Sequence, residues 1–216
     1  MNNRGRCRIL VADDHDIVRA GLKQLLNAQA GWEICAEAKT GREAVTLAQQ
    51  FEPDVVVMDI SMPQLNGLDA TRMICQLLPK TKIVILSVHF SDQLIRDITE
   101  AGAQGYVLKS DAASELVVAV RAVANGGSYF TSEAANTLTG PHRIPDPSSF
   151  RKRLTPRERE VVQLLAEGKS SKEVAVSLGI STKTAETHRA NVLRKLDLHS
   201  AVELVRYAIK NKIVEA

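Results

Sequence analysis

The sequence predicts an α/β fold with a doubly wound, five-stranded parallel sheet, followed by a second, smaller all-α domain. Apolar stretches of strand length alternate with longer segments of helical period through the first 125 residues. A stretch rich in Gly, Pro and Ser then interrupts this pattern, and four short helical segments follow it. A length of 216 residues also suits two domains better than one.

The predicted strands are short runs rich in β-branched residues, which suits strands covered on both faces. They span residues 8–12, 32–36, 54–59, 82–87 and 105–108. The helices predicted to follow them span residues 17–28, 41–51, 67–78, 91–101 and 112–125. Gly102 and Gly126 stand where helices commonly end. Each strand is thus followed by a helix, as parallel pairing requires.

Residues 126–150 are predicted to be a linker, because they contain Gly126-Gly127 and the prolines Pro141, Pro145 and Pro147. A short helix near residues 132–138 is expected at its start. The sequence therefore predicts a first domain at residues 6–125 and a second at residues 151–216.

Helix-capping signals organise the second domain. Thr155 with Glu158, and Ser170 with Glu173, have the spacing of a capping box, in which two side chains satisfy the free N–H groups that begin a helix. The four predicted helices span about residues 155–167, 170–178, 182–196 and 200–210. Gly179 separates the second helix from the third, which is typical of a helix-turn-helix motif at residues 171–190.

Composition excludes several classes of protein. Hydrophobic residues at 44% and charged residues at 25% are close to the averages of soluble globular proteins. The apolar runs are far shorter than the roughly 20 residues that cross a bilayer, so we expect a cytoplasmic protein without a membrane partner. Cys7, Cys35 and Cys75 match neither a disulfide framework nor metal-ligand spacing, and we expect reduced, mostly buried thiols. Residues 141–216 hold 15 basic against 9 acidic residues, which favours a nucleic acid partner.

Polar side chains stand where the predicted strands end. Asp13 and Asp14 follow the first strand, Asp59 ends the third, Ser87 ends the fourth and Lys109 follows the fifth. Parallel strands end at one edge of the sheet, and such sheets bind ligands there. Three carboxylates in one crevice repel one another unless a cation is bound, and oxygen ligands of this kind suit Mg²⁺.

An aspartate beside such an ion, with a lysine and a hydroxyl nearby, can attack a phosphoryl group and form an aspartyl phosphate. The ion and the lysine would stabilise charge on the transferred oxygens. The alternative is that these aspartates only cap the helices that follow. His89 is either a proton shuttle or metal ligand, or a solvated loop residue. Tyr106 is either a switch residue or an aromatic residue of the core.

This pattern resembles the receiver domain of NarL/FixJ-type two-component response regulators, which has a flavodoxin-like fold. The resemblance rests on Asp13-Asp14, residues 59–63, Asn66-Gly67, Ser87 and residues 106–109. It implies that a sensor histidine kinase phosphorylates Asp59. It further implies a Mg²⁺ site made by Asp13, Asp14, Asp59 and the carbonyl group of Ser61.

The same resemblance implies that Ser87 and Lys109 bind the phosphate, and that Ser87 and Tyr106 move on switching. In this family the residue after the lysine is often a proline preceded by a cis bond, whereas here Ser110 follows Lys109. A cis bond before a residue other than proline costs about 3 to 4 kcal/mol, and the sequence leaves the isomer open.

Residues 154–158, 172–175, 184–188 and 191–196 resemble the LuxR-type DNA-binding domain. Its helix-turn-helix places the N-terminal part of the second helix in the major groove. The resemblance implies DNA contacts from Lys172, Thr182, Lys183, Thr184, Glu186, Thr187, His188, Arg189, Ala190 and Lys195. Glu186 would either accept a hydrogen bond from cytosine or only favour the positive end of its helix.

These motifs together predict a response regulator and transcription factor, not an enzyme, in which phosphorylation of Asp59 controls DNA binding. The expected partners are the histidine kinase, promoter DNA, a second copy of the chain after phosphorylation, and RNA polymerase. One rival is a metal-dependent phosphatase, but such enzymes usually have a second aspartate where this chain has Ser61. Another rival is a DNA-binding or adaptor protein that works without phosphate.

Overall fold

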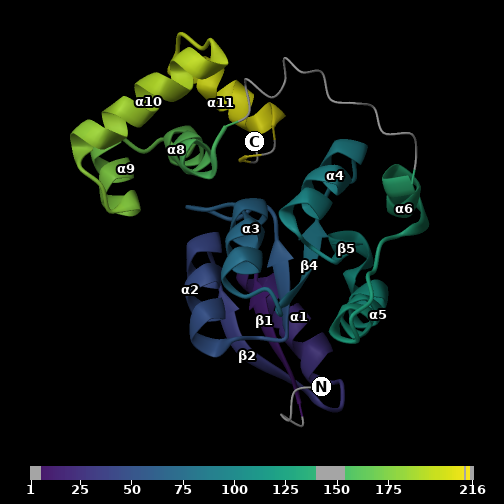
Figure 1. The fold of residues 1–216 in the computed structure, drawn as a ribbon. Helices are drawn as coiled ribbons and strands as arrows, with labels where there is room; N and C mark the ends of the chain where they lie inside the picture. The colour runs from purple at the N-terminus through teal and green to yellow at the C-terminus, as the bar shows by residue number, and fades with distance from the viewer. Residues whose placement is uncertain (1–5, 140–153, 212, 215–216) are drawn as a thin grey trace. The chain divides into compact units, whose positions relative to one another are not determined.

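A computed structural model describes residues 6–139, 154–211 and 213–214 of the chain (Figure 1). The chain divides into two compact units, one made mainly of residues before 140 and the other mainly of residues after 140. The first is an α/β unit and the second is all-α, which confirms the predicted fold class. Residues 140–150 of the predicted linker lie outside the described residues, so the domain limits stay a prediction.

The α/β unit is built on a parallel sheet whose strands lie in the order β2-β1-β3-β4-β5. The strands are β1 (Cys7–Ala12), β2 (Trp32–Ala38), β3 (Val55–Asp59), β4 (Lys82–Ser87) and β5 (Gly105–Leu108). Val55, Val56 and Val57 are all fully buried, because helices cover both faces of this central strand. The carboxyl ends of β1 and β3 are neighbours in the sheet.

The helices of this unit are α1 (Asp16–Asn27), α2 (Gly41–Phe51), α3 (Gly67–Leu77), α4 (Asp92–Ala101) and α5 (Ala112–Ala124). Helices α1 and α5 cover one face of the sheet, where Leu22 and Leu116 pack with Ile9 and Val57. Helices α2, α3 and α4 pack side by side. The side chains of Thr40 and Ser91 accept hydrogen bonds from the first turns of α2 and α4, which explains where these helices begin.

The segment after α5 lies along the edge of β5. The Tyr106 amide donates to the Tyr129 carbonyl at 2.8 Å, and the Tyr129 amide donates to the Gln104 carbonyl at 2.9 Å. The predicted short helix follows as α6 (Ser132–Thr139), and Thr137 Oγ1 donates to Asp92 Oδ1 at 2.6 Å. The chain thereby covers a strand edge that would otherwise expose unpaired N–H and C=O groups.

The second unit contains α8 (Pro156–Ala166), α9 (Ser171–Leu178), α10 (Thr182–Leu196) and α11 (Ala201–Lys210). Both predicted capping boxes are present, at Thr155 with Glu158 and at Ser170 with Glu173. Gly179 ends α9 in the left-handed conformation, with φ 63°, which glycine adopts without strain. Two clusters of buried residues hold the four helices together, one around Val162 and one around Val174.

Two sequence predictions need correction. Strand β2 extends two residues beyond the predicted end, to Ala38, because a register shift between Ile9 and Leu10 lets it pair with β1 along its length. The three cysteines are free, as expected, but they are half-buried and not mostly buried. The other described elements match their predicted spans to within one residue at each end, which is within the usual uncertainty at helix and strand ends.

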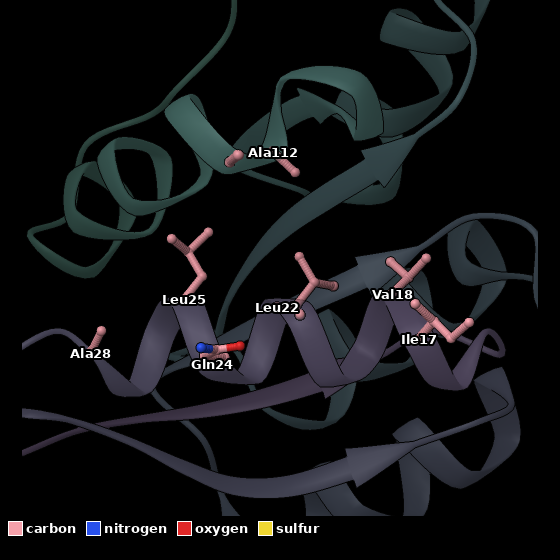
Figure 2. Close-up of a pocket in the computed structure, with 9 residues that line it drawn as sticks. Ile17, Val18, Leu22, Gln24, Leu25, Ala28 and Ala112 are labelled. Carbon is pink, nitrogen blue, oxygen red and sulfur yellow. The ribbon is translucent and has the colours of Figure 1, made fainter.

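An open pocket of about 530 Å³ lies between α1 and the start of α5 (Figure 2). Its lining is mostly apolar and includes Ile17, Leu25 and Ala112. Ile17 is 89% exposed. This pocket contains none of the residues that the sequence analysis assigned to a site. In the described ranges, every helix is too short or too polar to span a bilayer.

Candidate functional site

Three acidic side chains and one imidazole converge where strands β1 and β3 end. Asp13 and Asp14 follow β1 directly, and Asp59 is the last residue of β3. Asp13 is fully buried and Asp59 is only 2% exposed. One ligand atom from each of Asp13, Asp14, His15 and Asp59 lies within 4.8 Å of the other three. The fold therefore brings together the three carboxylates that the sequence analysis singled out, and we call these four residues the carboxylate cluster.

Lys109 contacts two members of this cluster. It begins the short 3-10 helix η1 (Lys109–Asp111), and its Nζ lies 2.9 Å from Asp13 Oδ2 and 2.9 Å from Asp59 Oδ2. Burial lowers the pKa of the ammonium group, but the Asp59 and Asp13 carboxylates raise it more, so the net pKa lies above its usual value. Lys109 is therefore a charged group between two acids at neutral pH.

Burial dominates the electrostatics of Asp59. It raises the pKa of this carboxyl to about 6, although the Lys109 ammonium acts in the opposite direction. The Asp13 carboxylate adds to the rise, and a hydrogen bond from the Ser61 amide opposes it. A further positive charge at this place would stabilise the carboxylate form of Asp59.

The cluster has the donors that a hard dication needs. Asp13 Oδ2, Asp14 Oδ1 and Asp59 Oδ2 are buried, and none accepts a well-aligned hydrogen bond from the part of the chain that the structure describes. Lys109 Nζ lies near two of these oxygens as an ion-pair partner. Lys109 pairs with only two of the three carboxylates, Asp13 and Asp59, so the carboxylates carry more negative charge than this ammonium group offsets. Buried carboxylate oxygens with such an excess fit Mg²⁺.

Ser87 and Tyr106 converge on the loop after β4. Ser87 is buried at the end of β4, and its hydroxyl donates to the His89 carbonyl at 2.9 Å and accepts from the His89 amide at 3.1 Å. The Tyr106 side chain is fully buried, and its hydroxyl donates to the same carbonyl at 3.0 Å. Its ring lies 6.3 Å from that of Phe90. The loop thus contacts both predicted switch residues through the backbone of His89, whose own side chain is exposed.

His15 and Arg19 belong to the site although the sequence analysis did not select them. His15 Nδ1 lies 2.8 Å from Asp14 Oδ1, and Arg19 Nη1 donates to the Asp13 carbonyl at 2.9 Å. Arg19 is nearly buried, and this bond holds the loop between β1 and α1. The position of His15, immediately after Asp13-Asp14, is the signal that could have identified it.

The backbone beside the site answers one open question. No cis peptide bond occurs in the described ranges, so the Lys109–Ser110 bond is trans. The Ser61 amide contributes a hydrogen bond to Asp59. The role of the Ser61 carbonyl as a metal ligand stays a prediction.

Helix α10 carries most of the residues predicted to contact DNA. It begins after Ser181, whose hydroxyl accepts from the Thr184 amide at 3.1 Å. The exposed members of the predicted set are Lys172, Lys183, Thr184, Glu186, Thr187, Arg189 and Ala190. Thr182 and His188 are half-exposed. Ala185 is buried against α9 and fixes which face of α10 points to solvent.

Lys195 differs from the other basic residues of α10. Its Nζ donates to Glu158 Oε2 at 2.7 Å, and its side chain is 27% exposed. This contact connects the end of α10 to the capping box of α8. The described contacts therefore give Lys195 a role within its own domain, and its role in DNA binding stays a prediction.

Comparisons with known proteins agree with this architecture. Residues 9–121 match the response regulator receiver domain, and residues 152–208 match the luxR family of bacterial regulatory proteins. The chain is 39% identical to the transcriptional regulatory protein MctR of Rhizobium johnstonii, over 99% of this chain and 98% of MctR. It is 38% identical to the transcriptional regulatory protein LiaR of Bacillus subtilis, over 96% of this chain and 99% of LiaR.

A solved structure extends the comparison. The crystal structure of a LuxR-family two-component response regulator from Aurantimonas sp. SI85-9A1 is 37% identical, with a TM-score of 0.59. The match covers 62% of this chain and 95% of that one.

Proposed function

The chain belongs to the two-component response regulators that join a receiver domain to a LuxR-type DNA-binding domain, and on this premise we propose that phosphorylation of Asp59 controls its binding to promoter DNA. Like its relatives, the chain is a transcriptional regulator and not an enzyme. The observation that carries the proposal is the position of Asp59, buried at the end of β3 with Lys109 Nζ 2.9 Å away. A sensor histidine kinase is the phosphate donor.

Each residue of the site has a distinct part in this reaction. Asp59 is the nucleophile: a carboxylate oxygen bonds to the phosphorus of the donor while the bond from that phosphorus to the donor's histidine nitrogen breaks, and the histidine leaves. Asp13, Asp14, Asp59 and the Ser61 carbonyl would hold Mg²⁺, which when bound neutralises negative charge on the phosphoryl oxygens. Lys109 stabilises charge on the same group through its ammonium. The catalysis is limited to phosphorylation and dephosphorylation of the protein itself.

Ser87 and Tyr106 would couple the charge of the phosphate on Asp59 to a change in the conformation of the receiver domain. The phosphate offers strong acceptor oxygens, and the Ser87 hydroxyl leaves the His89 carbonyl to donate to one of them. The loop that contains His89 then moves, and the Tyr106 side chain moves into the space that the loop leaves. Phosphorylation in this way shifts an equilibrium between two conformations of the receiver domain.

The DNA contacts follow from helix α10. The residues proposed to contact DNA are Lys172, Thr182, Lys183, Thr184, Glu186, Thr187, His188, Arg189, Ala190 and Lys195. Two phosphorylated copies would bind paired half-sites, because helix-turn-helix dimers read symmetric operators. With promoter DNA as its partner, the protein would act in the bacterial cytoplasm, where RNA polymerase would be a further partner.

The experiment compares DNA affinity with and without acetyl phosphate and Mg²⁺. Wild-type protein should bind selected DNA at least about tenfold more tightly after phosphorylation, which corresponds to about 1.4 kcal/mol. Asp59→Ala should bind the same DNA without any response to the donor. Asp111→Ala removes an exposed carboxylate of the same domain and should respond as wild type does.

Two results would overturn the proposal. One is equal DNA binding by wild type and Asp59→Ala at every donor concentration, which would support a regulator that works without phosphate. The other is the absence, in mass spectra of the treated protein, of a base-labile phosphate on Asp59.

A further inference from the structure

His15 occupies the N-cap position of α1, but its side chain does not cap the helix. Ser, Thr, Asp and Asn are preferred at this position, because their oxygens accept hydrogen bonds from the first turn. The imidazole of His15 makes no such bond. The local hydrogen bonds of His15 come from its backbone: its amide donates to Asp13 Oδ1 at 2.8 Å, and its carbonyl accepts from the Arg19 amide at 3.0 Å. The cap position therefore does not explain a histidine.

The imidazole lies among the carboxylates instead. His15 Nδ1 is 2.8 Å from Asp14 Oδ1 and 3.4 Å from Asp13 Oδ1. The His15 side chain as a whole is 63% exposed. The nearest ligand atoms of His15 and the three carboxylates lie within 4.8 Å of one another.

We propose that His15 is a ligand for transition-metal dications at the carboxylate cluster, so that the protein binds Mn²⁺ and Co²⁺ through oxygens and one nitrogen. Mg²⁺ would be held by the same carboxylates through oxygens alone. The inference rests on the proposed function, because both concern the dication that accompanies phosphorylation of Asp59.

The chemistry of the donors separates the two kinds of ion. Mg²⁺ is a hard ion that takes oxygen ligands and keeps several of its waters. Imidazole suits transition metals, and affinity rises from Mn²⁺ to Co²⁺ along the first row. A neutral imidazole added to three carboxylates therefore increases affinity for Mn²⁺ and Co²⁺ and leaves affinity for Mg²⁺ almost unchanged.

The geometry needs only a small adjustment. Atoms that bind one ion at about 2.1 Å lie no more than about 4.2 Å apart, compared with the 4.8 Å limit of the four ligand atoms here. In the neutral ring one nitrogen carries the proton. When the second nitrogen carries the proton, Nδ1 has a free lone pair with which it could bind an ion that the Asp14 carboxylate also holds.

The test measures dication binding by the full-length protein in a mildly alkaline buffer. Titration calorimetry with MgCl₂, MnCl₂ and CoCl₂ gives the three dissociation constants. Pulsed electron paramagnetic resonance of the Mn²⁺ complex reports whether a nitrogen atom is bound to the ion. The variants are His15→Ala and His15→Asn, and His199→Ala is the control.

His199 is a matched control, because its Nε2 also lies near a carboxylate, 3.7 Å from Asp197 Oδ1, but in the other domain. We expect His15→Ala to weaken Mn²⁺ and Co²⁺ binding about tenfold, equivalent to about 1.4 kcal/mol. Mg²⁺ binding should change less than about twofold, equivalent to about 0.4 kcal/mol. The nitrogen signal should vanish in both His15 variants and persist in His199→Ala.

Three results would overturn the inference. A nitrogen signal that persists in His15→Ala would assign the ligand to another residue. Equal weakening of Mg²⁺ and Mn²⁺ binding, with unchanged circular dichroism, would show that His15 only orients Asp14. Wild-type protein that binds none of the three ions would overturn both this inference and the proposed role of Mg²⁺ at Asp59.

Discussion

Ser87 and Tyr106 donate their hydroxyl groups to one shared acceptor, the carbonyl oxygen of His89, at 2.9 and 3.0 Å. One residue ends β4 and the other lies within β5, so the shared oxygen joins two strands to the loop that precedes α4. A carbonyl oxygen has two lone pairs and can accept both bonds. Loss of one donor therefore weakens the hold on the loop without leaving the acceptor unpaired.

Tyr106→Phe tests this shared acceptor. It removes the hydroxyl and keeps the buried ring, so unfolding free energy should fall by about 1 kcal/mol, the net value of one hydrogen bond. The increase in DNA affinity on phosphorylation should shrink, because the side chain at position 106 no longer binds the loop through the His89 carbonyl. Urea denaturation and DNA titration with acetyl phosphate measure the two effects. Tyr129→Phe keeps its backbone bonds to β5 and should behave as wild type; an equal loss in this control would contradict the assignment.

Lys109→Ala removes the positive charge between Asp13 and Asp59. Phosphorylation by acetyl phosphate should slow by about 100-fold, the usual effect of removing one group that stabilises a developing charge. The rate is followed by mass spectrometry of the intact protein. Lys39→Ala is the control, because Lys39 pairs with Asp16 at the exposed surface. A Lys109→Ala rate within twofold of wild type would remove Lys109 from the mechanism.

The pH dependence of stability should reveal the buried Asp59 carboxyl when dications are chelated. Its pKa is raised from 3.8 to about 6, so between these values the native state binds more protons than the unfolded state. Unfolding free energy contributed by Asp59 is therefore largest below about pH 4 and is lost as the pH rises through about 6. A rise of this size in the pKa of one carboxyl corresponds to about 3 kcal/mol as an upper bound.

Asp59→Asn abolishes this titration, because an amide does not ionise in this range. The variant should be more stable than wild type at neutral pH, and the difference should shrink toward about pH 4. Thermal unfolding in EDTA across this range gives the comparison. Asp111→Asn changes an exposed residue, so its stability relative to wild type should not depend on pH in this way. If the stability difference between Asp59→Asn and wild type is also independent of pH, the Asp59 carboxyl ionises normally.

Gly67→Ala probes the close approach of α3 to the site. A Cβ atom at Gly67 would lie 1.9 Å from the Asp59 carbonyl oxygen, so the backbone must shift. We expect a loss of about 3 kcal/mol, the upper range for overpacked sites. Gly21→Ala is the matched control within α1, where an added Cβ meets nothing within 4 Å. Alanine at Gly21 should stabilise the helix by about 1 kcal/mol. Urea denaturation of both variants measures whether the free energy of unfolding falls or rises relative to wild type.

Arg189→Ala tests the proposed DNA face of α10. Removing one side chain that binds a DNA phosphate should reduce the slope of log affinity against log salt concentration by about 0.9. Binding should weaken to a similar degree on specific and nonspecific DNA. Lys80→Ala removes an exposed cation of the receiver domain and should leave the slope unchanged. An unchanged slope for Arg189→Ala would place its side chain away from the DNA backbone.

Local signals in the sequence identified most elements and the three carboxylates. Alternation of strand and helix predicted a parallel sheet, and parallel strands end at one edge, so Asp13 and Asp59 were expected at the same edge of the sheet. Their adjacency follows from the pairing of β1 with β3. Capping boxes at Thr155 and Ser170 predicted helix starts, because they depend only on residues three positions apart. Local signals of this kind can be recognised without knowing which helices or strands pack against the element.

The tertiary structure decided what these local signals leave open. The extension of β2 to Ala38 depends on its pairing with β1, and the shared His89 carbonyl depends on how the loop after β4 meets β5. The place of His15 among the carboxylates depends on the turn between β1 and α1, which Arg19 holds. The sequence by itself determined which chemical groups stand at the strand ends. The contacts of Lys109 with Asp13 and Asp59, and of Tyr106 with the His89 carbonyl, were decided only by packing between segments far apart in the chain, because hydrogen bonds are sensitive to small displacements.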